Sequence, residues 1–298
     1  MNLGYACINT ALNANKITTN RTMRRKTFDA RGIDYVSELA LANVKDLKTI
    51  IQWNNEMKIK LFRLSSGIFP WSDEYNIKDL KDYKEISKIM LEVGKIAKDA
   101  GQRLTMHPGP YNCLASPTQK VVKKTIRELN FHSEQFNMMG YDPSPYNKIN
   151  IHVGGAYGDK KGTLDAFCHN FKLLNEDTKK RLVIENDDSP NEYSVNDLYW
   201  GIHKRIGIPI TFDYFHHKFN TGTLTEEEAL RMASTTWPKK ITQCCHYSES
   251  RRKEKLDESI RPQAHSDLIY EKINTYGLNL DIVIEAKSKE QAIFKRVI

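Results

Sequence analysis

The sequence predicts an α/β protein with one domain, a (β/α)8 barrel that spans residues 1–298. Eight short apolar runs typical of strands alternate with segments typical of helices, which fits a closed barrel better than an open sheet. The apolar runs contain few alternating polar positions, as expected for strands that are buried on both faces. Residues 9–33 and 66–78 form long connections after predicted strands, and such loops surround the catalytic face of a barrel.

The order of the elements follows from the hydrophobic runs and from the capping residues between them. The expected strands occupy residues 3–8, 60–65, 103–107, 149–154, 181–186, 208–213, 241–246 and 280–285. The expected helices occupy residues 34–56, 79–100, 118–139, 163–178, 194–205, 225–236, 265–276 and 287–297. Ser194, Thr225 and Ser288 are typical N-cap residues, and Glu228 and Gln291 complete the capping pattern of the helices expected at 225–236 and 287–297.

The composition is that of an ordinary globular protein, with 40% apolar and 28% charged residues in a chain of 298. No apolar stretch approaches the roughly 20 residues that a membrane helix needs, so no membrane contact is expected. The first ten residues, MNLGYACINT, lack the basic and apolar parts of a secretory signal peptide. We therefore expect a monomer in the cytoplasm, associated with the nucleoid, or in the nucleus or an organelle if the source is eukaryotic or viral.

The five cysteines do not indicate a disulfide framework or a zinc knuckle, because their number is odd and no CxxC pair occurs. Cys244 and Cys245 are adjacent, but neighbours on a strand point to opposite faces. We expect both to be small buried hydrophobic residues.

The net charge of +8 favours a polyanionic partner such as nucleic acid. Part of the excess is concentrated in residues 16–31 and 251–255. A basic surface that only keeps the protein in solution would give the same numbers. Charge alone leaves both interpretations open.

Histidines and carboxylates gather at the carboxyl ends of the predicted strands. These residues are His107, His152, Glu185, Asp213, His216, His217, His246, His265 and Glu285. A barrel directs the ends of all its strands toward one mouth, so we expect these side chains to converge. Six of the nine histidines belong to this set, and only His132, His169 and His203 fall on predicted helices.

Such a convergence favours a metal site over a buried polar network, because burying many unpaired His and carboxylate groups is costly. Imidazole and carboxylate ligands without thiolates suit Mn²⁺, Zn²⁺ or Fe²⁺ better than Mg²⁺. So many ligands usually hold two or three ions, which suits in-line displacement at a phosphate. Sugar isomerisation is a competing metal chemistry, for which a catalytic lysine and a small polyol pocket would be needed.

Cations and aromatic residues on the predicted rim favour nucleic acid over a sugar. The first loop region is expected to hold Tyr5, Asn9 and a cluster of Arg21, Arg24, Arg25 and Lys26. Later loops bring Tyr111, Tyr157, Arg251, Arg252 and Lys253. Each aromatic residue alone is more often a packing residue, but together they could stack bases beside neutralised phosphates.

The ordered motifs of the chain resemble those of the UV damage endonuclease family, whose members have a TIM barrel like that of xylose isomerase. The motifs are GYACIN (4–9), FRLSS (62–66), HPGPY (107–111), IHVGG (151–155), IEND (184–187), DYFHH (213–217), HYS (246–248), AHSD (264–267) and DIVIEAKSKEQAI (281–293). They cover essentially the whole barrel. The resemblance implies a DNA repair enzyme that cuts the backbone 5′ of UV photoproducts with a cluster of divalent ions, typically manganese.

The resemblance also implies roles for individual residues. The metal ligands would be His107, His152, Glu185, Asp213, His216, His246, His265 and Glu285. Of these, Glu185, His246 and His265 would be catalytic. Tyr5 and Asn9 match positions that line the lesion pocket, and Tyr111 matches an aromatic residue that enters the duplex. The basic clusters on the rim, rather than the resemblance, make Arg24, Arg25 and Arg251 the expected DNA contacts.

Three positions depart from the family pattern. Pro110 replaces a glutamine that accompanies the aromatic wedge, so a wedge of one residue is expected. Cys244 replaces a lysine that precedes the strand-seven histidine and can be carbamoylated. The loop GIFPWSDEY (67–75) lacks a further histidine and offers Asp73 or Glu74 instead.

The leading hypothesis is a metal-dependent endonuclease that hydrolyses DNA immediately 5′ of cyclobutane dimers, (6–4) products and some other lesions, initiating excision repair. An abasic-site endonuclease or a sugar isomerase on the same barrel is an alternative enzyme. A damage-binding protein that does not cut is a third interpretation, which the cysteine at position 244 keeps open.

Overall fold

Eight parallel strands form one sheet in the computed structural model, which describes residues 1–295. The strands are β1 (Asn2–Ala6), β2 (Leu61–Leu64), β3 (Arg103–Met106), β4 (Ile149–Ile151), β5 (Leu182–Glu185), β6 (Ile210–Thr211), β7 (Gln243–Tyr247) and β8 (Leu280–Ile284). Their order is β6-β5-β4-β3-β2-β1-β8-β7. This order follows the chain around a ring, so the predicted (β/α)8 barrel is confirmed.

The ring is nearly closed between β6 and β7. The backbone N–H of His246 donates to the carbonyl of Phe212 at 2.9 Å, and Asp213 and His246 form a parallel bridge. Asp213 and His246 are both predicted metal ligands. The seam of the barrel therefore runs through the candidate site.

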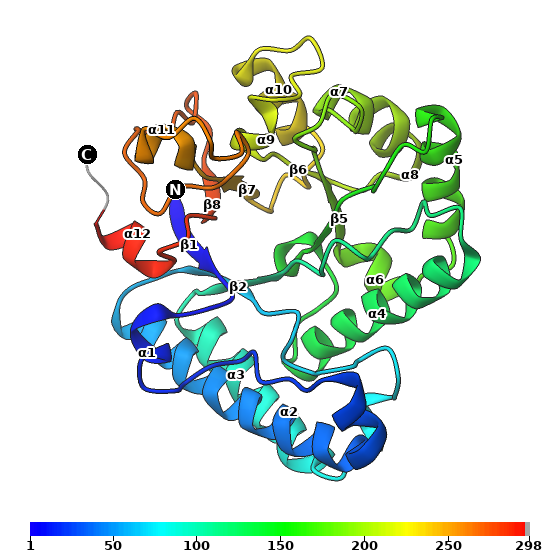
Figure 1. The fold of residues 1–298 in the computed structure, drawn as a ribbon, viewed down its shortest axis with the longest axis vertical. Helices are drawn as coiled ribbons and strands as arrows, with labels where there is room; N and C mark the ends of the chain where they lie inside the picture. Colours follow the sequence, from blue (N-terminus) through cyan, green and yellow to red (C-terminus); the bar gives the residue numbers. More distant parts are fainter. Residues whose placement is uncertain (296–298) are drawn as a thin grey trace.

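Helices surround the strands on the outside of the barrel (Figure 1). They are α1 (Thr10–Asn13), α2 (Arg25–Glu56), α3 (Tyr83–Asp99), α4 (Gln119–Met138), α5 (Lys160–Phe171), α6 (Glu176–Arg181), α7 (Val195–Leu198), α8 (Lys204–Ile206), α9 (Tyr214–His217), α10 (Glu226–Ser234), α11 (Arg251–Lys255) and α12 (Glu290–Phe294). A π-helical turn (Tyr199–His203) joins α7 to α8, and 3-10 turns span Ile77–Asp79 and Pro145–Asn147. Among the described helices, none is both long and apolar enough to span a bilayer.

The helix expected at 265–276 is wrong, because acidic side chains take the backbone N–H groups that a helix would need. Glu254 accepts from the N–H groups of Asp267 and Leu268, and Glu249 accepts from those of Tyr270 and Glu271. The segment is therefore an irregular loop held by two carboxylates. The helix that follows β7 is the short α11 instead.

Three other expected helices differ in extent. Helix α2 begins at Arg25, nine residues before the predicted start, and it is broken at Gly32, where φ is 63°. The helix expected at 163–178 is divided into α5 and α6. The last helix, α12, is shorter than predicted, and residues 296 and 297 of that expectation lie outside the described residues.

The barrel interior contains an apolar layer and polar groups. Ala6, Leu61, Val183, Cys244 and Val283 form the apolar layer. Cys245 belongs instead to the large core between strands and helices, so the prediction that both cysteines are buried on opposite faces is confirmed. An ion pair between Arg103 and Asp281, 2.9 Å long, is also buried within the barrel.

Candidate metal centre

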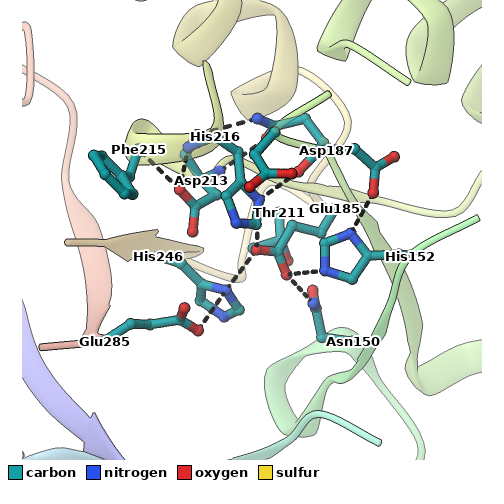
Figure 2. A network of polar contacts seen from close by, with 12 residues as sticks. Asn150, His152, Glu185, Asp187, Thr211, Asp213, Phe215, His216, His246 and Glu285 are labelled. Atoms are coloured by element: carbon teal, nitrogen blue, oxygen red, sulfur yellow. Dashed lines mark hydrogen bonds and ion pairs between the residues drawn. The ribbon is translucent and has the colours of Figure 1, made fainter. Parts of the chain in front are cut away.

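Glu185 is the centre of a cluster of imidazoles at the carboxyl ends of the strands (Figure 2). It ends β5 and is 1% exposed. Its Oε2 lies 3.2 Å from Nε2 of His107 and 3.8 Å from Nε2 of His152. These two histidines directly follow β3 and β4, so parallel strands bring all three residues to one mouth.

The other oxygen of Glu185 faces two more histidines. Oε1 lies 3.0 Å from Nδ1 of His246 and 3.6 Å from Nδ1 of His216. His246 comes from β7, and His216 is in the short helix α9 that follows β6. One buried carboxylate thus has four imidazoles around it, contributed from four different strands or their loops.

Asp213 carries an orphaned oxygen within this cluster. Its Oδ1 caps α9 by accepting from the N–H groups of Phe215 at 2.7 Å and His216 at 2.8 Å. Its Oδ2 is buried and has no hydrogen-bond partner among the described residues. Burial raises the pKa of Asp213 to about 7, against the lowering effect of His216. A buried carboxylate oxygen that no protein donor satisfies is suited to bind a metal ion.

Glu285 closes the cluster on the side of β8. Its Oε1 lies 3.3 Å from Nδ1 of His246, and its Oε2 lies 3.7 Å from Nδ1 of His265. It also forms an ion pair with Arg63, which belongs to β2. Burial opposes ionisation of Glu285, but the Arg63 guanidinium and His246 hold its pKa below the ordinary value.

Neighbouring oxygens orient the imidazoles by holding one ring nitrogen. Nδ1 of His152 lies 2.7 Å from Oδ1 of Asp187, and Nδ1 of His216 lies 2.8 Å from the carbonyl of Asn186. Nδ1 of His107 contacts the carbonyl of Pro108 at 3.1 Å. For His107 and His152 these contacts leave Nε2 facing Glu185, as is usual for histidines that bind metals, whereas His216 approaches Glu185 through the same Nδ1.

The charges of the cluster reinforce one another. Burial opposes ionisation of Glu185, but His246, His152 and His107 hold its pKa well below the ordinary value. Burial lowers the pKa of His152, yet Glu185 and Asp187 raise it to about 10. The pKa of His216 is raised to about 9 by Asp213 and Glu185 in the same way. In contrast, burial lowers the pKa of His246 to about 3. Protonated imidazoles thus balance part of the negative charge of the carboxylates.

Two overlapping groups of ligand atoms fit a metal ion. His107, His152 and Glu185 form one, and Glu185, Asp213 and His246 form the other, with the ligand atoms of each group within 4.8 Å of one another. Glu185 belongs to both. Nitrogen and carboxylate donors without thiolates match the set that divalent first-row metals take. His265 and Glu285 lie at the edge of the second group.

A buried cation, Lys148, and a partly buried one, Arg63, belong to this cluster and were missed by the sequence reasoning. Lys148 lies 3.0 Å from Nε2 of His246. The alternation of strand residues could have indicated it, since positions 148, 150 and 152 share one face of β4 and its flanks. The same alternation turns the side chain of Arg63, which belongs to β2, toward the barrel interior.

Asp73 and Glu74 are both engaged on the rim. Asp73 pairs with Lys124 at 2.7 Å, and Glu74 pairs with Arg25 at 2.7 Å. Neither belongs to the two ligand groups found among the described residues. The structure therefore does not bring the proposed substitutes to the Glu185 cluster.

Tyr5 and Asn9 are not on the rim, and the expectation that they face DNA is wrong for this structure. Tyr5 is 0% exposed and Asn9 is 1% exposed. Tyr5 donates to Oδ1 of Asn54 at 2.8 Å and accepts from Asn9, which also caps α1 through Leu12. Alternation along β1 turns Ala6 into the barrel, so Tyr5 points outward and packs on Phe62.

The other predicted DNA contacts are accessible. Tyr111 is 88% exposed, beside the exposed Pro110. Arg24 is exposed, whereas Arg25 is shared between Asp29 and Glu74. Arg251 at the start of α11 lies 3.8 Å from Asp267.

A cavity of about 360 Å³ lies between the cluster and the loop that carries Tyr111. Its lining includes His107, Pro110, His152, Asp187 and His216. Predicted ligands and the predicted wedge loop therefore border the same space. Such a space at the carboxyl ends of barrel strands is where substrates bind in this fold.

Comparison with known sequences finds one family over nearly the whole chain. Residues 1–297 match the family described as UV-endonuclease UvdE. A UV-damage endonuclease of Schizosaccharomyces pombe is 37% identical, over 98% of this chain and 49% of its own length. A UV DNA damage endonuclease of Clostridium perfringens is 32% identical, over 99% of this chain and 69% of its own length. The chain thus spans about half the length of the fungal relative.

Solved structures show the same barrel. SacUVDE superposes with a TM-score of 0.85 at 30% identity and covers 100% of this chain and 96% of its own. Endonuclease IV from Thermus thermophilus has a TM-score of 0.56 at 10% identity and covers 98% of this chain and 95% of its own. D-psicose 3-epimerase from Clostridium cellulolyticum has a TM-score of 0.54 at 14% identity and covers 80% and 78%. The last two share the fold alone, and a fold alone does not select a reaction.

Proposed function

Because the chain belongs to the UV-endonuclease UvdE family, we propose that it is a UV-damage endonuclease. It hydrolyses DNA immediately 5′ of UV photoproducts, namely cyclobutane dimers and (6–4) products, and of some other lesions, which initiates excision repair. The observation that carries the proposal is the buried Glu185 with its four imidazoles at the mouth of the barrel. That cluster lies where barrel enzymes bind their substrates.

The cluster would hold two or three divalent ions, most suitably Mn²⁺, with Zn²⁺ or Fe²⁺ as other candidates. The residues that would hold them are His107, His152, Glu185, Asp213, His216, His246, His265 and Glu285. Bound ions supply positive charge where negative charge develops during phosphate hydrolysis. The orphaned Oδ2 of Asp213 supports this assignment from the protein side.

The reaction adds one water across the bond between phosphorus and the 3′ oxygen. The residues of the centre have different roles in it. Glu185 and His246 are buried, so they act by holding and orienting the centre. His265 has a side chain that is 26% exposed, and its Nδ1 lies 3.2 Å from the carbonyl of Glu285. Its Nε2 is therefore the ring nitrogen that would face the ions, at the accessible edge of the centre.

The rim would bind damaged double-stranded DNA. Tyr111 would enter the duplex and stack on a base, while Pro110 stiffens the loop behind the ring. Arg24, Arg25 and Arg251 would neutralise phosphates, with Arg24 the least engaged within the protein. Tyr5 and Asn9 support the first loop from within instead of contacting DNA.

The assay that tests the proposal is nicking of UV-irradiated and undamaged duplexes of the same sequence, with Mn²⁺ and with EDTA. We expect cutting only of the irradiated duplex and only without chelator. Equal cutting of both duplexes would contradict the proposed specificity for damage. Cutting in EDTA would contradict the proposed dependence on metal ions. An abasic duplex, tested in parallel, separates this activity from that of an abasic-site endonuclease, and a gel shift without nicking would indicate a damage-binding protein.

A further inference from the structure

Lys148 has an unusual place in the barrel. It directly precedes β4, is 0% exposed, and extends its amine into the interior. Its Nζ lies 2.9 Å from Oγ1 of Thr211, 3.2 Å from Oδ1 of Asn150 and 3.0 Å from Nε2 of His246. All its hydrogen-bond partners within the described chain are neutral or aromatic side chains. Burying an amine without a carboxylate partner is costly, so an apolar side chain of the same length would serve packing better.

Lys148 completes a closed circuit of hydrogen-bonding contacts around the candidate centre. Its amine contacts the carbonyl oxygen of Asn150, whose amide donates to Oε2 of Glu185. Oε1 of Glu185 contacts Nδ1 of His246, and Nε2 of His246 contacts Lys148 again. The four side chains therefore hold one another in place. Removing the amine would release both His246 and Asn150 at once.

The circuit determines how the His246 ring is turned. With Nε2 against Lys148, Nδ1 lies 3.0 Å from Glu185 and 3.3 Å from Glu285. A half-turn of the ring about its bond to Cβ would put carbon atoms where Nδ1 and Nε2 now lie. Both hydrogen bonds would then be lost. Contacts on opposite edges therefore select one of two rotamers.

We propose that Lys148 is a positioning residue of the metal centre, which holds Nε2 of His246 and thereby keeps Nδ1 turned toward the two carboxylates. The inference rests on the proposed function, because the centre binds divalent ions only under that proposal. Cys244, two residues before His246 on the same inward face of β7, is too short to hold the ring in this way. The holding group is supplied from β4, across the barrel.

The test is Lys148→Met in the full chain, which removes the amine and keeps the length of the side chain. We expect the affinity for Mn²⁺, measured by calorimetric titration and by the electron paramagnetic resonance of free Mn²⁺, to fall about 10- to 100-fold. The thermal midpoint of the metal-free protein should change little, since the loss of three hydrogen bonds is offset by removal of a buried amine that has no carboxylate partner. A purely structural lysine would instead lower the midpoint and leave the affinity of the folded fraction unchanged.

Thr105→Val is the matched control. Thr105 is a buried residue of β3, and its hydroxyl has no hydrogen-bond partner among the described residues. The substitution therefore removes a buried polar group that forms no hydrogen bond to a predicted ligand. We expect its Mn²⁺ affinity to equal that of the unaltered protein. A loss as large as that of Lys148→Met would mean that any change of this kind disturbs the centre, which would overturn the inference.

Lys148→Gln and a spectroscopic measurement keep the inference testable if Lys148→Met does not fold. The amide retains a donor, so its loss of affinity should be smaller than that of the methionine variant. Long-range ¹H–¹⁵N spectra of metal-free protein, assigned with His246→Gln, should show altered ring-nitrogen shifts of His246 in both variants. Unchanged shifts and unchanged affinity would overturn the role of Lys148. Failure of the unaltered protein to bind Mn²⁺ would instead contradict the proposed function.

Discussion

Asp213 and His246 form a parallel bridge between the end of β6 and β7, so the barrel closes through two of its candidate metal ligands. Their side chains share one group of ligand atoms with Glu185. An ion held there would link three strands across the seam. Metal binding and closure of the fold would therefore be coupled at this position.

We expect divalent ions to stabilise the folded protein for this reason. An ion at 100 times its dissociation constant adds about 2.7 kcal/mol to the free energy of unfolding if it binds only the folded state. Thermal unfolding in Mn²⁺ and in EDTA measures the difference. Asp213→Asn should reduce the shift caused by Mn²⁺. Identical midpoints in Mn²⁺ and EDTA at saturating concentrations would contradict a site at the seam.

Glu185→Gln should abolish nicking with little change in the fold. Glu185 belongs to both groups of ligand atoms, and the amide keeps its size while removing the charge. Circular dichroism checks the fold, and nicking of irradiated duplex checks the activity. Asp187→Asn is a graded comparison, because Asp187 orients His152 but belongs to neither group of ligand atoms, and this change should reduce activity about 10- to 100-fold. Full activity of Glu185→Gln would refute the site assignment.

The metal-free protein should lose stability as the pH rises from about 7 to about 9. The pKa of His152 is raised to about 10 and that of His216 to about 9, against an ordinary value of 6.5. A raised pKa means that the folded state binds the proton more tightly, so this stabilisation is complete below pH 6.5 and is lost as the pH approaches 9 and 10. The pKa of Asp213 is raised to about 7, so the stabilisation that comes from its bound proton is already lost when the pH reaches 9.

Urea unfolding at the two pH values measures this decline. Saturating Mn²⁺ should reduce it, because the ion takes the place of the protons on the ligands. His152→Gln should also flatten the pH dependence. A free energy of unfolding that increases over this interval in metal-free protein would show that the cluster is not held together by protonated imidazoles.

Pro110→Gln should change the affinity for lesions more than the rate of cutting. Pro110 lies on the rim beside the exposed Tyr111 and contributes no predicted ligand. Tyr111→Ala is the reference variant, with a loss of about 1–3 kcal/mol of binding free energy for one stacked base. Gel shifts on irradiated duplex and single-turnover nicking separate the two effects. If Pro110→Gln changes neither quantity, the loop does not act as a wedge.

Arg24→Ala should weaken the binding of damaged and undamaged DNA alike. Each lost phosphate contact should reduce the slope of log affinity against log salt by about 0.9. Arg25→Ala should have a smaller effect, because Arg25 already pairs with Asp29 and Glu74. Lys240→Ala is the control, since Lys240 is exposed just before β7 at the opposite end of the barrel. An effect confined to irradiated DNA would contradict a phosphate contact.

Most of the barrel and the candidate ligands could be predicted because both depend on local pattern. Strand length, apolar runs and capping residues are encoded within a few residues of each other, and parallel strands end at one mouth whatever the loops do. His107, His152 and Glu185 are therefore brought together as the sequence predicts. The helix expected at 265–276 failed because Glu249 and Glu254, distant in sequence, take its backbone N–H groups.

The sequence by itself determined the number and order of the strands and the residues at their carboxyl ends. Only the tertiary structure decided what Tyr5 and Lys148 contact, since each lies at a strand whose two faces are both buried. Burial on both faces weakens the polar alternation that would separate inside from outside. Tyr5 consequently packs outward against Phe62, and Lys148 reaches inward to His246, a contact across the barrel that sequence neighbours do not specify.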